Sequence, residues 1–282
     1  WSSDVCSSDL DSLDGERIHE TIDGVYKVKY APYRNERNDI AGIIMVFQDI
    51  TQEHKLESMR KEFVANVSHE LKTPITTIKS YTESLMDDSI QPDIQQKFLS
   101  VIDGECDRMA RLVRDLLQLS NIDYKKTKWV RTELSTNSLI QDIVSKLEVL
   151  SREKGQRISC TFAEPIPNVL GDKDGIEQVF INIISNAVKY TENNGEIKIA
   201  TYNEGNSIRI KVSDNGIGIP EDDLNRIFER FYRVEKGRSR DLGGTGLGLS
   251  IAKEIIEAHY GEIKLYSKYG SGTTVEIILP TA

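Results

Sequence analysis

One histidine of this chain lies in a setting that suits nucleophilic chemistry. His69 is followed by Glu70, and Thr73 stands one helical turn further along the chain. A carboxylate beside an imidazole can bind the proton on one ring nitrogen and leave the other nitrogen free as a nucleophile. A threonine hydroxyl one turn away on the same helix face can position a water molecule. This stretch predicts chemistry at the imidazole, and a solvated surface histidine is the alternative.

Polar side chains on a predicted helix of the C-terminal half suggest a phosphate ligand. Asn182, Asn186 and Lys189 fall at i, i+4 and i+7 on one face of this helix, away from its apolar stripe. An amide oxygen can bind Mg²⁺ when phosphates balance most of the metal's charge. This face therefore predicts a magnesium and phosphate site, and surface solvation is the alternative.

Two glycine-containing segments point to the same ligand. Asp214 directly follows an alternating strand, where its carboxylate can accept a hydrogen bond from an exocyclic amine, and Gly216 and Gly218 let a flat base approach the backbone. Residues 244–248, Gly-Thr-Gly-Leu-Gly, open a helix whose free N–H groups and dipole can receive phosphates. This loop lacks the lysine and hydroxyl residue that end a Walker loop.

A basic cluster lies between these two segments, in a glycine-bounded stretch of about 25 residues. A stretch of this length predicts a mobile lid that carries cations to phosphate, and an amphipathic surface segment is the alternative. The cations are Arg233, Lys236, Arg238 and Arg240.

The histidine requires a helical scaffold. Apolar residues at steps of three and four follow Thr51 and recur after Pro92, which predicts an αα-hairpin. A lone hairpin cannot enclose its seam, so we expect a dimeric four-helix bundle, with His69 exposed opposite the seam and Pro74 permitting a kink. The seam positions are Val64, Val67, Leu71, Pro74, Ile78, Tyr81 and Leu85, then Phe98, Ile102, Cys106, Met109, Val113 and Leu116.

The nucleotide residues require a mixed scaffold. Helical patterns near residues 135–155, 173–190 and 249–259 alternate with strand patterns near 157–162, 196–202, 207–213, 262–267 and 273–279. Gly270 and Gly272 predict a hairpin turn before the last strand. Runs of strands with the helices on one side of them predict an α+β sandwich. Near the N-terminus, residues 25–30 and 40–50 predict a β-hairpin.

Composition limits the class of protein. The chain has 282 residues, 38% of them hydrophobic, and a formal charge of −9, which fits a globular protein of two or more domains and argues against nucleic-acid binding by bulk charge. No apolar run is long enough for a membrane span, and residues 1–10 lack the pattern of a signal peptide. Three cysteines without metal or redox spacing favour a reducing, cytoplasmic compartment.

Taken together, residues 55–280 resemble the sensor histidine kinases of two-component signalling. Residues 69–74 resemble the H box, 182–190 the N box, 214–218 the G1 box, 228–231 the F box and 244–248 the G2 box. Each motif is short, but five in this order are specific. Within the family the chain is similar to the PhoR and WalK-like group of Gram-positive bacteria, and residues 24–50 resemble the end of a PAS sensor domain.

The resemblance implies a multidomain fold. We expect a tail or scar at residues 1–10, part of a PAS-like sensor at 11–52, a dimerisation and histidine phosphotransfer domain at 53–125, and a Bergerat-type α+β ATP-binding sandwich at 126–282. It further implies ATP and Mg²⁺ as cofactors, a homodimer, a response regulator receiver domain as partner, no nucleic acid, and a full-length parent anchored in the bacterial membrane.

The resemblance also assigns roles to single residues. His69 becomes the phosphoacceptor, Glu70 its acid/base partner, and Thr73 the residue that orients water for dephosphorylation of the regulator. Asn186 becomes the Mg²⁺ ligand. The implied nucleotide contacts are Asn182, Lys189, Tyr190, Asp214, Gly216, Gly218, Arg233, Gly244, Thr245, Gly246, Leu247 and Gly248.

Two other classes of function remain open from the sequence. The same ATP-binding sandwich occurs in the gyrase, Hsp90 and mismatch-repair ATPases, which lack a His-Glu helical hairpin ahead of the nucleotide domain. A catalytically silent dimerisation scaffold is the second, although intact His69, Asn186 and Asp214 argue against it. A nucleotide-binding titration distinguishes the scaffold from the enzymes.

Overall fold

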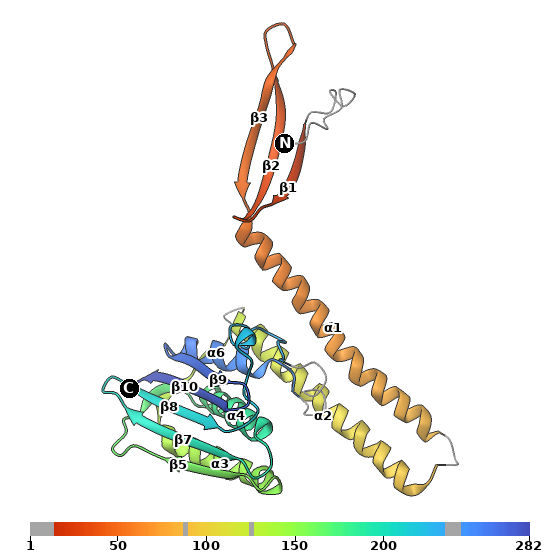
Figure 1. Cartoon of the computed structure of the whole chain (residues 1–282). Coiled ribbons are helices and arrows are strands. Elements are labelled where there is room, and N and C mark those ends of the chain that lie inside the picture. Colours follow the sequence, from red (N-terminus) through yellow and green to blue (C-terminus); the bar gives the residue numbers. More distant parts are fainter. Residues whose placement is uncertain (1–13, 87–89, 124–126, 235–243) are drawn as a thin grey trace. The chain divides into compact units, whose positions relative to one another are not determined.

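The computed structural model describes residues 14–86, 90–123, 127–234 and 244–282 (Figure 1). The chain divides into two compact units, Trp1–Ser68 and His69–Ala282. We describe each unit by itself.

The first unit contains a three-stranded antiparallel sheet. Its strands are β1 (Gly15–Glu20), β2 (Val25–Arg34) and β3 (Ile40–Asp49), in the order β1-β2-β3. Strands β2 and β3 form the hairpin that the sequence predicts, whereas β1 was not predicted because its GERIHE sequence carries a single apolar residue. The sheet is tied to the start of helix α1 (Thr51–Leu85), since the Thr51 hydroxyl accepts a hydrogen bond of 2.9 Å from the Val25 N–H.

The second unit begins within α1 and contains the helical hairpin. Helix α1 continues through Pro74, which is buried, and is followed by α2 (Pro92–Asp123). The rings of Tyr81 and Phe98 meet edge to face with centroids 4.8 Å apart, which joins the two helices as the predicted seam requires. The helical hairpin of the predicted fold is therefore confirmed.

The buried face of α2 differs in part from the predicted stripe. Cys106 and Val113 are exposed, whereas Leu112 and Leu119 are buried and belong to the main hydrophobic core of this unit. Leucines seven residues apart form a second apolar face beside the predicted stripe. The end of α2 therefore packs on the following α/β region, and a pattern of apolar residues on two faces could not show which face is buried in one chain.

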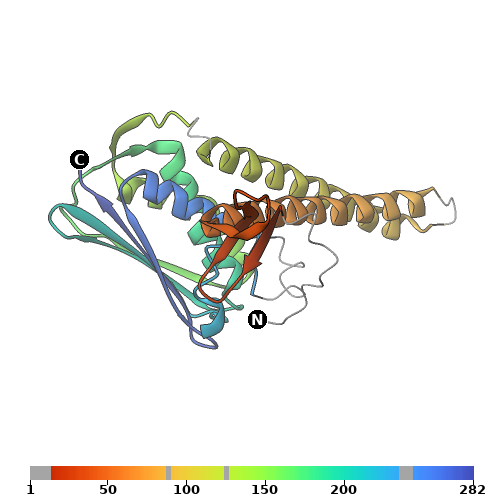
Figure 2. The same cartoon turned by 90° about the horizontal axis from the view of Figure 1, so that it is seen from above.

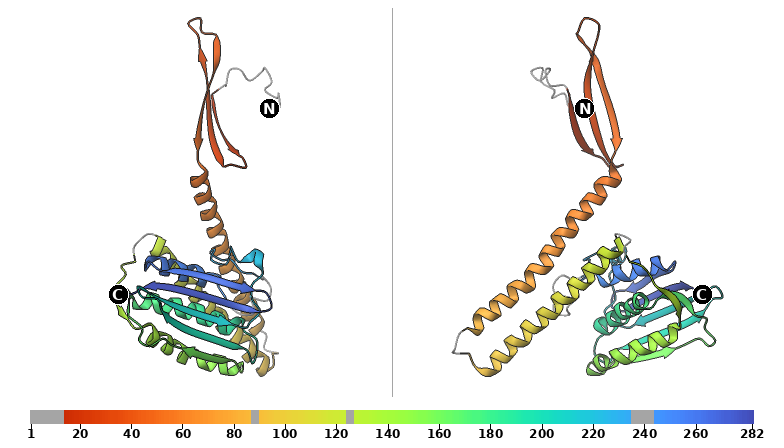
Figure 3. Two further views of the ribbon diagram at one scale, coloured as in Figure 1. Left: turned by 60° about the vertical axis from the view of Figure 1, so that its left-hand side comes forward. Right: turned by 180° about the vertical axis from the view of Figure 1, so that it is seen from behind.

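The rest of the second unit is the predicted α+β sandwich. Its five-stranded sheet has the order β5-β7-β8-β10-β9, in which β5 pairs in parallel with β7 and the other pairs are antiparallel. The strands are β5 (Arg157–Thr161), β7 (Glu196–Asn203), β8 (Ser207–Asp214), β9 (Glu262–Lys268) and β10 (Gly272–Pro280). Helices α3 (Thr136–Glu153), α4 (Lys173–Tyr190) and α6 (Gly248–Ala258) cover one face of this sheet (Figures 2 and 3).

Three short elements were not predicted. Strands β4 (Arg131–Leu134) and β6 (Val169–Asp172) pair with each other in a separate two-stranded sheet, and residues Glu221–Asp223 form the 3₁₀ turn η2. A strand of four residues carries too little alternation to be recognised without its partner.

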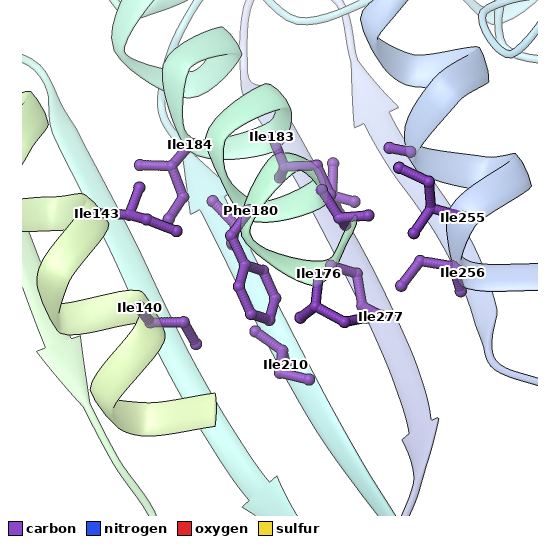
Figure 4. Close-up of a cluster of buried hydrophobic side chains, with 14 of the residues drawn as sticks. Ile140, Ile143, Ile176, Phe180, Ile183, Ile184, Ile210, Ile255, Ile256 and Ile277 are labelled. Atoms are coloured by element: carbon purple, nitrogen blue, oxygen red, sulfur yellow. The ribbon is translucent and has the colours of Figure 1, made fainter. Parts of the chain in front are cut away.

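The core lies between the three helices and the sheet. The Phe180 side chain, which is fully buried, points from α4 toward Ile210 of β8, with isoleucines of α3 and α6 on either side (Figure 4). Helix α4 supplies its inner face at the spacing Ile176, Val179, Phe180 and Ile183, which is why one side of the helix is buried and the other is left for polar residues.

Hydrogen bonds at its N-terminus fix the start of α4. The Asp172 carboxylate caps the helix by accepting a hydrogen bond of 2.9 Å from the Gly175 N–H, and its second oxygen accepts one from Val130. The Asp172 N–H donates to Nε2 of His259, a buried residue at the end of α6. Helices α4 and α6 are thus tied together at the end that lies away from the predicted nucleotide residues.

Candidate nucleotide and phosphoacceptor site

A cavity of about 940 Å³ opens in the second unit, where the predicted nucleotide residues converge. This volume is at the upper end of the range that small-molecule sites occupy. Helix α4, the end of β8, the start of α6 and the C-terminal half of α2 contribute to its walls. The predicted residues that line it are Asn182, Asn186, Lys189, Tyr190, Asp214, Gly218, Arg233, Gly244, Thr245, Gly246 and Gly248.

Two of the predicted nucleotide residues, Gly216 and Leu247, do not line the cavity but lie behind residues that do. A side chain at Gly216 would place its Cβ 2.3 Å from the carbonyl oxygen of Tyr190, so glycine is required there for backbone packing. Leu247 is fully buried in the core and anchors the loop of residues 244–248, which we call the glycine loop. Both residues support the wall from outside the cavity.

The two asparagines of α4 differ in their surroundings. Nδ2 of Asn182 donates to the carbonyl of Gly248 at 2.9 Å, and its Oδ1 accepts a hydrogen bond from Gln178, so this amide fastens α4 to the glycine loop. Asn186 lies one turn further along, half-buried and on the cavity wall. Of the two, Asn186 is the one placed to meet a ligand in the cavity.

Lys189 is a cation held in an unfavourable environment. Burial, and to a smaller extent the positive charges of Arg233, Lys154 and Arg108, together lower the pKa of Lys189 to about 8. Its ammonium lies over the Tyr190 ring, 4.7 Å from the centroid. A cavity that lowers the pKa of its lysine in this way favours an anion beside it.

Asp214 is fixed at the end of β8 by the last hairpin of the chain. Its Oδ1 accepts hydrogen bonds from the N–H groups of Gly216, at 2.9 Å, and Thr273, at 3.2 Å, while burial raises the pKa of the carboxyl. A Cβ at Gly272, where φ is +97°, would lie 1.9 Å from the Asp214 carbonyl oxygen. The predicted Gly270–Gly272 turn therefore also positions Asp214, a role that the sequence did not indicate.

The glycine loop is braced from two directions. The Thr245 hydroxyl donates to Oδ2 of Asp115 on α2 at 2.9 Å and accepts a longer hydrogen bond from the Leu247 N–H. The N–H of Phe231 donates to the carbonyl of Gly246 at 3.0 Å, and both residues have positive φ. The loop thus leads into the N-terminus of α6, where backbone N–H groups can bind phosphate.

The basic segment is described only in part. Arg233 lines the cavity, whereas the predicted cations Lys236, Arg238 and Arg240 lie outside the described residues. Just before this segment, the Arg230 guanidinium donates hydrogen bonds of 2.6 and 3.2 Å to Oε1 of Glu254 on α6. Sequence reasoning missed this pair, because the two residues are 24 positions apart and no local pattern joins them.

The histidine site lies on the helical hairpin. His69 is exposed, as predicted, and the Thr73 hydroxyl donates to the His69 carbonyl at 3.2 Å. Glu70 accepts a hydrogen bond of 2.8 Å from Arg108 of α2, a residue that is 8% exposed. We predicted that Glu70 can accept a hydrogen bond from the His69 ring; in the structure the Glu70 carboxylate accepts one from Arg108, which the sequence did not single out.

The donor set of the cavity suits one kind of metal. Within the described parts of the chain, no group of three or more His, Cys, Asp and Glu side chains gathers as a metal site. A magnesium ion that takes most of its ligands from phosphates and water needs no such group, and one amide oxygen such as that of Asn186 fits this pattern.

Comparisons with known proteins agree with this geometry. The family model of the histidine kinase-, DNA gyrase B- and HSP90-like ATPases matches residues 171–282, that of the His Kinase A (phospho-acceptor) domain matches residues 59–125, and that of the PAS domain matches residues 10–51. The sensor histidine kinase WalK of Bacillus subtilis is 43% identical over 263 residues, which are 91% of this chain and 42% of that protein. The chain belongs to the sensor histidine kinase family. A phosphoacceptor match ahead of the ATPase match separates it from the gyrase and Hsp90 ATPases.

Other relatives extend the comparison. The sensor protein kinase WalK of Staphylococcus epidermidis is 40% identical over 272 residues, 93% of this chain and 43% of that protein, so the chain spans less than half the length of these relatives. The crystal structure of histidine kinase ThkA in complex with response regulator protein TrrA matches with a TM-score of 0.65 at 26% identity, covering 98% of this chain and 81% of that one. Histidine kinase AdeS of Acinetobacter baumannii matches with a TM-score of 0.62 at 25% identity, covering 76% of this chain and 98% of that one.

The sequence-based recognition of the family and of the fold is therefore confirmed. The ATPase match supports the use of ATP. Among the described residues, no helix combines the length and apolar character that crossing a membrane requires.

Proposed function

We propose that this chain transfers the γ-phosphoryl group of ATP to His69 and then passes it to an aspartate of a response regulator. The observation that carries the proposal is one compact unit that holds both an exposed His69 imidazole on a helical hairpin and a cavity lined by Lys189, Asp214 and the glycine loop. The cavity suits an adenine nucleotide, and the imidazole suits nucleophilic attack on phosphorus.

Each wall of the cavity has a part in holding the nucleotide. Asp214 would accept a hydrogen bond from the exocyclic amine of adenine, because its carboxylate lines the cavity and is fixed by two backbone N–H groups. The glycine loop at the N-terminus of α6 and the cations Lys189 and Arg233 would bind the phosphates. The amide oxygen of Asn186 would hold Mg²⁺, and the bound metal neutralises charge on the phosphates.

The transfer step needs few protein groups. A ring nitrogen of His69 forms a bond to the γ-phosphorus as the bond from phosphorus to the bridging oxygen of ADP breaks, so the products are phosphohistidine and ADP. Glu70 would bind the proton on the other ring nitrogen and keep the attacking nitrogen unprotonated. In the present arrangement Glu70 is held by Arg108 at 2.8 Å, so this role requires the carboxylate to exchange Arg108 for the imidazole.

The partners follow from the hairpin. Two α1–α2 hairpins would form a four-helix bundle in a homodimer, which covers the exposed apolar positions Cys106 and Val113. A receiver domain would dock beside the exposed His69, and ThkA bound to TrrA is a related complex of a kinase with a regulator. Thr73, one turn from His69, would orient water when the kinase dephosphorylates the regulator. Because ATP is a cytoplasmic substrate, we place this part of the protein in the cytoplasm, and the membrane anchor of the parent stays a prediction.

Incubation with γ-labelled Mg·ATP tests the proposal. Label that is acid-labile and alkali-stable, and that is lost in His69→Gln while ATP binding is kept, is the expected result. A folded protein that binds ATP but takes up no label would instead support a silent scaffold or an ATPase. The Thr73→Ala variant is expected to keep autophosphorylation and to dephosphorylate the regulator more slowly; an unchanged rate would remove Thr73 from this role.

A further inference from the structure

A carboxylate from α2 occupies one side of the glycine loop. Oδ2 of Asp115 accepts the hydrogen bond of Thr245 at 2.9 Å, and Asp115 lines the same cavity as Lys189 and Asn186. The arginines of α2 that line the cavity beside it, Arg111 and Arg114, are exposed. A negative charge therefore lies in a part of the cavity whose backbone and cations otherwise suit an anion.

Packing fixes Asp115 in this position. Leu112 and Leu119, three residues before and four residues after it, are 3% and 0% exposed and belong to the core of the α/β region. Residues at these spacings share a helix face, so the face of α2 that carries Asp115 is the face that is buried. The hydrogen bond to Thr245 is thus part of a packed contact rather than an isolated surface contact.

Burial is unfavourable for the charge of this carboxylate. Burial raises the pKa of Asp115, although the hydrogen bond from Thr245 and the charges of Arg114 and Arg111 act in the opposite direction. A nucleotide triphosphate on the glycine loop would bring further negative charge close to Asp115, and like charges in a partly buried site repel strongly.

We propose that Asp115 is a determinant of nucleotide affinity: its carboxylate holds α2 on the glycine loop through Thr245, and the phosphates of a nucleotide displace it. This inference rests on the proposed function, because it assumes that phosphates bind at the glycine loop. Docking of α2 and binding of phosphates then oppose each other, and by linkage each weakens the other by the same factor.

Nucleotide affinity of the whole chain tests the proposal. We expect Asp115→Asn, which removes the charge and keeps the shape, to tighten the binding of Mg·AMP-PNP by about fivefold, and less at high salt. The affinity for adenosine, which has no phosphates, is expected to stay the same. Asp107→Asn is the matched control, because it removes one carboxylate from an exposed position on the same helix and is expected to leave both affinities unchanged.

Hydrogen exchange of residues 108–119 provides the second readout. In the wild-type chain Mg·AMP-PNP is expected to speed amide exchange in this part of α2, and in Asp115→Asn the exchange is already faster without nucleotide. An unchanged or weaker affinity of Asp115→Asn for Mg·AMP-PNP would overturn the inference, as would an equal gain for adenosine. A folded wild-type chain that binds no Mg·AMP-PNP would refute the proposed function itself, which separates the two failures.

Discussion

The low pKa of Lys189 makes nucleotide binding a proton-linked event. With a pKa of about 8, roughly half of the free protein carries a neutral Lys189 at pH 8 and about a tenth at pH 7. A triphosphate beside the ammonium favours its charged form and raises the pKa. Binding at pH 8 is therefore expected to take up about 0.5 proton at this residue, and about 0.1 proton at pH 7.

The sign of the effect on affinity follows directly. The protonated lysine binds phosphate better, so affinity is constant below pH 8 and falls as pH rises above it, by up to about tenfold per pH unit. Isothermal titration calorimetry with Mg·AMP-PNP in buffers of different ionisation enthalpy measures the proton uptake. The Lys189→Arg variant keeps the positive charge but does not titrate near pH 8.

Two outcomes would refute this reasoning. The first is an observed binding enthalpy at pH 8 that is the same in every buffer for the wild-type chain. The second is a proton uptake that persists at its full size in Lys189→Arg, which would assign the proton to another group, such as Asp214 or the nucleotide.

Three further predictions concern stability and the architecture of the cavity. Phe180→Ala is expected to lower the free energy of unfolding by about 3–5 kcal/mol in urea titrations, because a fully buried ring leaves a cavity between α4 and β8; a loss below 1 kcal/mol would contradict this packing. Gly272→Ala is expected to weaken nucleotide binding, since its Cβ would lie 1.9 Å from the carbonyl oxygen of Asp214. Gly205→Ala is the control for backbone strain, because Gly205 also has a positive φ but lies in open space. Equal effects of the two substitutions on nucleotide affinity would refute the role of Gly272. His259 is buried, and desolvation lowers its pKa below the ordinary value of 6.5. The unfolded chain therefore binds this proton more readily, and the free energy of unfolding is expected to fall as pH drops below about 6.5. A pH profile of stability that is identical in His259→Gln would rule this out.

Helix α4 shows what local pattern can predict. Its bounds, Lys173–Tyr190, match the predicted range because an amphipathic pattern runs between a capping aspartate and a break in periodicity, and both signals are local. Strands β4 and β6 show the opposite case. Arg131 pairs with Asp172, 41 residues later, and neither four-residue strand is stable or recognisable without the other.

The residues of the candidate site also fall into those that a local sequence pattern can predict and those that it cannot. His69, Asn186, Asp214 and the glycine loop could be found because each carries its chemistry in a short run of sequence. Arg108 and Asp115 could not, since along α2 they look like ordinary solvated charges of an amphipathic helix. Their partners, Glu70 and Thr245, are 38 and 130 residues away in the chain, so only the packing of α2 reveals them.

The strand order of the sandwich has a consequence for protein synthesis. Strand β10, which ends two residues before the C-terminal end of this sequence, lies between β8 and β9 and completes the pairing of both. Strand β9 therefore leaves the ribosome with no partner in the sheet, and Asp214 lacks the Thr273 N–H until the last strand follows. A ribosome-bound chain that stops before Gly272 is expected to have a helical hairpin but an unfinished wall at Asp214, so nucleotide is expected to stabilise this fold only after β10 has been synthesised.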